Sequence, residues 1–114
     1  ASASFALSTV SAVAQTTYKF TDASGGTQDW TDGTNWDGGV APDPIAGDTI
    51  EANLTMSAAT FLNLGADRTF EVWTSNFQGF GSTEFTINSG QTITFAGTTP
   101  TISHNGKGSV TMEN

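Results

Sequence analysis

The chain contains no cysteine and little charge, and these absences exclude several classes of protein. Without cysteine there is no disulfide framework, no thiolate nucleophile and no cysteine zinc site. Charged residues make up 12% of the sequence, against about 25% in average proteins. Eleven acidic and three basic residues give a net charge of -8. Three basic residues are too few to neutralise the phosphates of a nucleic acid or of an anionic lipid surface. We therefore expect neither of them as a partner.

Membrane spans and a catalytic constellation are missing as well. No run of about 20 apolar residues occurs, so we expect no membrane-spanning helix. His104 is the single histidine, and no serine or cysteine nucleophile motif accompanies it. We therefore interpret His104 as a solvated turn residue. The sequence predicts a protein that is not an enzyme and has no catalytic residues.

The residues that are present favour short strands. Thr, Ser, Asn, Gln and Gly form most of the polar positions, and this composition suits strands and turns better than helices. Apolar segments recur near Phe85, Ile93, Ile102 and Val110, at intervals of 8, 9 and 8 residues (93−85, 102−93, 110−102). Alternation predicts strands with one buried face. The expected strands are residues 48–56, 60–65, 68–73, 84–88, 92–95, 100–102 and 109–112.

This spacing fits two architectures. A parallel solenoid would use two or three such steps for each coil, whereas a β-sandwich or jelly roll would join antiparallel strands by hairpins. Hairpins favour two-residue Asn-Gly or Asp-Gly turns, and most turns of this chain lack them. We therefore predict an all-β fold, a short parallel β-solenoid (β-helix) with an N-terminal extended strand, and keep the β-sandwich or jelly roll as the alternative. At 114 residues we expect one β domain over 18–114, with a capping loop at 18–47 and strand coils at 48–114.

Residues 1–17 differ from the rest because they carry no charge and are rich in Ala, Ser and Val. One interpretation is a remnant of an export signal, since Ala12-Val13-Ala14 has the small-x-small form of a cleavage site. The other is an extended strand with Phe5, Leu7 and Val13 on its apolar face. Both interpretations predict export through a signal peptide to the cell surface or the extracellular space.

The segment between residues 23 and 48 is dense in Gly, Asp, Asn and Pro. Trp30 and Trp36 lie six residues apart in it, and we expect them to plug one end of the core. Its Asp and Asn residues favour turns through their own backbone, which is the preferred interpretation. The alternative is a calcium site, the one cofactor considered, because calcium takes clustered oxygen ligands. Its candidate ligands are Asp32, Asn35, Asp37 and Asp48.

Two stretches resemble a known group of proteins. Trp30, Asn35-Trp36, Gly38, Pro42 and Gly47-Asp48 precede an apolar strand, and the tail reads "INSGQTITFAGTTPTISHNGKGSVTM". This arrangement, from about Tyr18 to Met112, resembles bacterial autotransporter-like β-helical passenger and surface proteins with Gly-rich strand repeats. The resemblance implies a right-handed parallel β-helix, export, and a role in surfaces or matrices. It implies no catalytic residues, and the chain departs from the group by its brevity.

The aromatic residues of 73–85 offer a competing function. Trp73, Phe77 and Phe85 have the spacing of core residues, whereas Phe80 lies between Gly79 and Gly81 and could stack on a sugar ring. A secreted carbohydrate-binding or adhesion module, with a polysaccharide partner, is therefore the alternative function.

The preferred hypothesis is self-assembly. An incomplete solenoid leaves backbone N–H and C=O groups unpaired at its ends, and a second copy of the chain can pair them. The head-to-tail contact would be donor-strand-like and produce a filament or matrix. Its expected interface residues are Phe5, Leu7 and Val13 on the donor strand and Ile102, Val110 and Met112 on the acceptor edge.

Overall fold

The protein is all-β, as the composition predicts, and its strands form parallel sheets. The computed structural model describes residues 15–79, 84–88 and 90–113. These residues contain one short 3₁₀ helix, η1 (Gly33–Asn35), and no α-helix. No helix in this part of the chain is long and apolar enough to cross a membrane.

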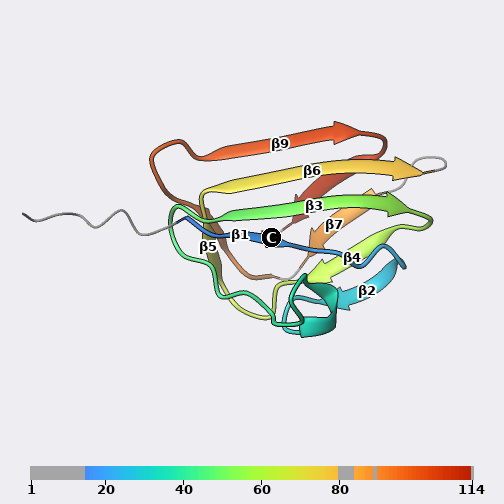
Figure 1. The fold of residues 1–114 in the computed structure, drawn as a ribbon, viewed down its shortest axis with the longest axis horizontal. Helices are drawn as coiled ribbons and strands as arrows, with labels where there is room; N and C mark the ends of the chain where they lie inside the picture. Colours follow the sequence, from blue (N-terminus) through green and yellow to red (C-terminus); the bar gives the residue numbers. More distant parts are fainter. Residues whose placement is uncertain (1–14, 80–83, 89, 114) are drawn as a thin grey trace, which may run out of the picture.

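The strands form three sheets around a common core (Figure 1). The first has the spatial order β1 (Thr17–Lys19), β3 (Thr49–Met56), β6 (Val72–Gly79) and β9 (Thr101–Gly106). The second has the order β2 (Gly26–Asp29), β4 (Thr60–Asn63), β7 (Glu84–Asn88) and β10 (Ser109–Glu113). The third contains β5 (Arg68–Phe70) and β8 (Ile93–Phe95).

The chain passes through these sheets in a repeating order, which we call a circuit. It runs β3, β4, β5, then β6, β7, β8, and then begins again with β9 and β10. Every pairing between named strands is parallel, so the alternative of an antiparallel sandwich or jelly roll is wrong for the described residues. Within the described residues, one isolated antiparallel bridge joins Phe20 to Trp36.

The apolar intervals explain the register of β7 with β10 and of β5 with β8. Val110 pairs with Phe85 and Phe95 pairs with Phe70, and both pairs are 25 residues apart (110−85, 95−70). This offset is the sum of the intervals 8, 9 and 8, one for each sheet of a circuit. Apolar residues at this offset lie over one another in adjacent strands, and they form the core between the sheets.

Buried and more exposed residues alternate along the strands, and the buried ones form the core. In β3 the buried residues are Ile50, Ala52, Leu54 and Met56, and the residues between them are exposed or half-buried. Trp73, Phe77 and Phe85 are also fully buried, as their spacing predicts. The buried side chains of β3, β4 and β6 therefore fill the space between the sheets, and most of the residues between them are polar and reach solvent.

The predicted boundary of the capping loop is wrong in its first half. Residues 18–47 contain most of β1 and all of β2, which pair in parallel with β3 and β4. The segment Gly26–Asp29 has the sequence GTQD, without an apolar residue, so its periodicity gives no strand signal. It forms a strand because its backbone pairs with the edge of β4.

Candidate functional site

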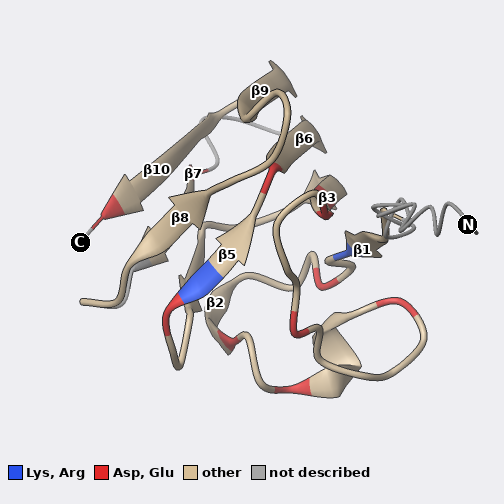
Figure 2. Cartoon of the chain, turned by 90° about the vertical axis from the view of Figure 1, so that its left-hand side faces the viewer, with Lys and Arg blue, Asp and Glu red and all other residues tan. Residues whose placement is uncertain are grey.

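The two ends of the stack of circuits differ, and the difference identifies a candidate site. At one end β8, β9 and β10 are each the outermost strand of their sheet, and Figure 2 shows the three of them. Each pairs with another described strand along one edge. No described strand pairs with the other edge, so the N–H and C=O groups there face outward, ready to pair. We call this end the open end.

Apolar side chains stand exposed at the open end, above buried ones. Ile102 is 58% exposed although it lies in register with Trp73, which is fully buried. Val110 and Met112 are half-buried and lie over Phe85 and Ile87. One further layer of strands would complete the burial of these side chains. The three residues predicted for an acceptor edge thus lie together on the last circuit.

A hollow opens between these strands. It has a volume of about 250 Å³. Ile93 and Phe95 of β8 line one side of it, and Ile102 and Met112 line the other. Gln91 and Glu113 contribute its polar rim. Apolar residues of three different sheets therefore meet in one concave site.

His104 belongs to this end, and its interpretation as a solvated turn residue is wrong. It lies in β9 in register with Ser75, and its Nδ1 is 2.8 Å from the Ser75 Oγ. Its ring packs 5.0 Å from that of Phe77, and its Nε2 is 3.3 Å from the Gly108 carbonyl oxygen. Trp73 Nε1 donates to the same Ser75 Oγ at 3.1 Å. We assign the tautomer with the proton on Nε2, since Nε2 then donates to Gly108 and Nδ1 accepts from Ser75.

His104 could have been recognised from the sequence by its parity. It lies two residues after Ile102, and side chains two apart in a strand share a face. The Asn105-Gly106 pair suggested a turn instead, whereas β9 continues through both residues.

The opposite end is closed by the chain itself. Trp30 and Trp36 are 0% and 3% exposed and pack against each other with ring centroids 4.7 Å apart. Trp30 Nε1 donates to the Pro42 carbonyl, and Trp36 Nε1 donates to the Trp30 carbonyl, both at 2.8 Å. Both indole N–H groups are thus satisfied within residues 30–42. The two tryptophans lie where a plug of the core was predicted.

The loop also covers the outer edge of the chain next to β1. Thr21 N donates to the Asn35 carbonyl at 2.8 Å, and Asp37 N donates to the Lys19 carbonyl at 2.9 Å. These bonds flank the Phe20–Trp36 bridge, so the chain next to β1 already has partners on its outer side. The loop 30–48 therefore acts at this end as natural solenoid caps do.

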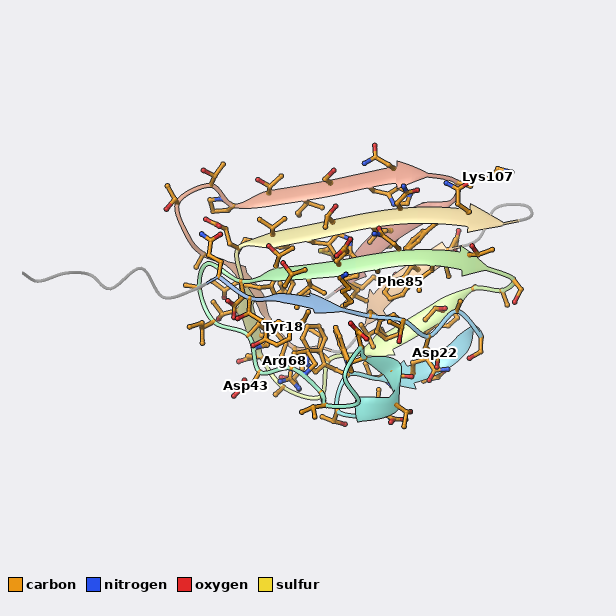
Figure 3. The ribbon with its side chains drawn as sticks, viewed as in Figure 1. Tyr18, Asp22, Asp43, Arg68, Phe85 and Lys107 are labelled. Carbon is orange, nitrogen blue, oxygen red and sulfur yellow. The ribbon has the colours of Figure 1, made fainter. Side chains whose placement is uncertain are left out.

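Arg68 of the third sheet also contacts the closed end. Figure 3 shows it near Asp43. Its guanidinium carbon lies 5.0 Å from the ring centroid of Trp30, and its Nε and Nη2 both donate to the Leu64 carbonyl. Burial lowers the pKa of Arg68 below its ordinary value, and the nearby Asp43 carboxylate opposes that shift. The contact is a cation–π interaction on a buried indole.

The three aspartates among the proposed calcium ligands do not form a cluster. No group of three or more His, Asp or Glu side chains close enough to hold a metal ion occurs in the described part of the chain. Asp32 accepts from Thr34, Asp48 accepts from the backbone N–H groups of Thr16 and Ile45, and Asn35 donates to the Asp29 carbonyl. These side chains therefore stabilise turns, as the preferred interpretation predicts.

Four of the predicted site residues lie outside the described residues. They are the donor-strand positions Phe5, Leu7 and Val13 and the sugar-stacking candidate Phe80.

Comparisons of this chain with protein-family models, with curated proteins and with solved structures found no match. A functional assignment therefore rests on the geometry of the chain itself.

Proposed function

We propose that the protein is a non-enzymatic structural component of the cell surface or extracellular matrix that assembles head-to-tail. One observation carries the proposal: the stack of circuits is closed at one end by its own loop 30–48 and open at the other, where β8, β9 and β10 surround an apolar hollow. The open end is the natural contact for a second copy.

The finer fold that we propose is a short right-handed β-solenoid. The repeated passage through three parallel sheets, with a 25-residue offset between Phe85 and Val110 and between Phe70 and Phe95, supports a solenoid. The handedness follows from the strong general preference for right-handed crossovers between parallel strands.

A partner at the open end would gain both polar and apolar contacts. Its strands would pair with backbone groups of the outermost strands, and its side chains would cover Ile102, Val110 and Met112. Burial of apolar surface stabilises by about 25 cal/mol per Å². Because donor and acceptor are different surfaces, the contact is head-to-tail and each added copy presents a new acceptor.

Features of the sequence support residues 1–14 as the donor strand and a location outside the cell. Residues 1–14 are uncharged and alternate in apolar residues around Phe5 and Leu7, as a strand added to a neutral edge requires. The low charge of the chain suits an exported protein.

The test is light scattering of the full chain over a range of concentrations, followed by electron microscopy. We expect the mass to rise with concentration and filaments to form. The variant Ile102→Asp places a charge on the acceptor edge and should remain small. Phe61→Asp is the matched control, because Phe61 is 43% exposed on the outer face of β4, away from the open end. Circular dichroism verifies that both variants fold.

A wild-type chain that stays a single small species at every concentration would refute the proposal. Equal loss of assembly in Ile102→Asp and Phe61→Asp would also contradict it, because the contact would then not be specific to the open end.

A further inference from the structure

The first sheet has a notch where the chain after β1 leaves β3. The pairing of β1 with β3 ends at Lys19 and Glu51, whereas β3 continues beyond this pair. Thr21 N donates to the Asn35 carbonyl of the loop 30–48 and not to β3. The chain therefore turns away from β3 beside Asn53, and the notch lies between the two segments.

Polar side chains line this notch, which has a volume of about 180 Å³. They belong to Lys19, Thr21, Glu51 and Asn53, and the buried Phe20 also lines it. Glu51 Oε1 accepts from Asn53 Nδ2 at 2.5 Å, so these two side chains hold each other in place. Pockets that enclose a drug-sized ligand have volumes of roughly 300 Å³ or more. The notch therefore admits one small polar unit of a larger ligand that lies over the sheet.

Beside the notch, a row of asparagines crosses the first sheet. Asn53, Asn76 and Asn105 lie in register in β3, β6 and β9, and all three are exposed. Figure 1 shows these strands side by side. Neighbouring strands lie about 4.8 Å apart, so the amides repeat at that spacing. We call these three residues the asparagine row.

A second row of polar side chains runs next to the asparagine row. Thr74 and Ser103 lie in register with Glu51, two residues before the asparagines of their strands. Side chains two residues apart in a strand share a face. Thr74 and Ser103 are half-buried, so they also reach solvent. The outer face of the first sheet thus carries a regular grid of amides and hydroxyls that leads away from the notch.

The chemistry of this face fits a neutral partner rich in hydroxyl groups. Amides and hydroxyls both donate and accept hydrogen bonds, as the hydroxyl groups of a sugar do. The charges of the notch are those of Lys19 and Glu51, which are register partners of opposite sign. The net charge of -8 repels anionic polymers. An uncharged glycan therefore suits this face better than a charged polymer.

We propose that this face binds a neutral polysaccharide whose chain crosses the strands of the first sheet. One sugar unit enters the notch, where Lys19 donates to its hydroxyl groups and Glu51 accepts from them. The next units lie along the asparagine row, where the amides of Asn76 and Asn105 bind their hydroxyl groups. A polymer fits the row because each strand adds one amide at the same spacing. This inference goes beyond the proposed structural role and does not depend on head-to-tail assembly, since the site lies on the outer face of one chain.

Affinity electrophoresis of the full chain in native gels tests the site. The gels contain dextran, laminarin or xyloglucan as neutral polymers, alginate as an anionic polymer, or no polymer. We expect at least one neutral polymer to retard the chain and alginate to leave its mobility unchanged. The double variant Asn53→Ala/Asn76→Ala should bind about ten-fold more weakly, because it loses two amides of the asparagine row. Asn63→Ala is the matched control, because Asn63 lies on the outer face of β4 in the second sheet, and it should retain the wild-type affinity.

Circular dichroism verifies that these exposed-site variants fold. No retardation by any of the three neutral polymers would overturn the inference. Equal weakening by Asn63→Ala and by the double variant would also overturn it, as would retardation by alginate alone.

One further variant separates this inference from the proposed assembly. Ile102→Asp, which should remain small, should still be retarded like the wild type, because Ile102 belongs to neither polar row. Loss of retardation in Ile102→Asp would mean that binding requires the assembled form, and would overturn a site on the single chain.

Discussion

Glu71 and Asp48 show how single residues hold the corners between sheets. They precede β6 and β3 at equivalent positions, and Glu71 N donates to the Asp48 carbonyl at 2.8 Å. Both side chains are buried, at 6% and 3% exposure. The Glu71 Oε1 accepts from Thr99 N at 2.8 Å, and Gly97 leaves room for the carboxylate because it has no Cβ. Each corner thus uses a buried carboxylate to satisfy backbone donors.

The substitution Glu71→Ala should destabilise the fold. It leaves the Thr99 N–H without its acceptor, at a cost of about 1–3 kcal/mol in the free energy of unfolding. Urea denaturation measures the change. Glu71→Gln keeps an acceptor oxygen and should cost less, and Glu84→Ala, at an exposed site on β7, should change stability by less than about 0.5 kcal/mol. Equal effects of Glu71→Ala and Glu84→Ala would show that the hydrogen bond from Thr99 N to Glu71 does not contribute to the free energy of unfolding.

Asp32 makes the stability of the closed end depend on pH. It is the N-cap of η1, and hydrogen bonds from the Thr34 hydroxyl and then from the Thr34 backbone N–H lower the pKa of its carboxyl below 3.8. A lowered pKa means that the stabilisation is present above the unfolded value and is lost as pH falls through the folded value. We expect Asp32→Asn to flatten the acid limb of the melting temperature below about pH 4. An unchanged acid limb in the variant would contradict this role.

At the scale of elements, the loop 30–48 replaces strands that the first circuit lacks. Trp30 contacts Trp36, Phe70 and Arg68, so it links the loop to the third sheet. Its N–H bond to Pro42 fixes the loop over the core. One indole therefore joins the loop, the third sheet and Pro42 at the closed end.

The substitution Trp30→Ala should cost about 3–5 kcal/mol of stability, the usual range for a buried aromatic. Val40→Ala in the same loop is the matched control, because Val40 is 74% exposed, and it should have almost no effect. Chemical denaturation followed by circular dichroism measures both. A loss below about 1 kcal/mol for Trp30→Ala would mean that the loop is not part of the cooperative fold.

The elements that the sequence predicts are those in which alternation and burial agree. Residues 48–56 predict β3 because Ile50, Leu54 and Met56 share one face. The predicted strand 68–73 is in fact two, β5 and β6, since the corner at Glu71 has no turn residue to mark it. On the candidate site, Ile102, Val110 and Met112 follow from alternation. The hollow could not be predicted, because it depends on how side chains from three different sheets come together.

At the scale of the whole molecule, charge is distributed unevenly along the stack. Figure 2 shows acidic residues gathered in the loops near β1 and η1, whereas β8, β9 and β10 are almost uncharged. Residues 22–51 contain seven acidic residues and no base. A head-to-tail contact brings the acidic end of one copy toward the open end of the next, so the contact itself gains little from ion pairs.

Salt should therefore promote assembly. Copies that each carry a net charge of -8 repel one another, and the repulsion falls as the Debye length shrinks from about 30 Å at 0.01 M to about 8 Å at 0.15 M ionic strength. We expect light scattering to show a lower critical concentration at the higher ionic strength. Lys107→Glu adds negative charge beside the open end and should raise that concentration, most strongly at low salt. Assembly that weakens as salt is added would instead indicate a contact held by ion pairs, which the apolar hollow at the open end does not offer.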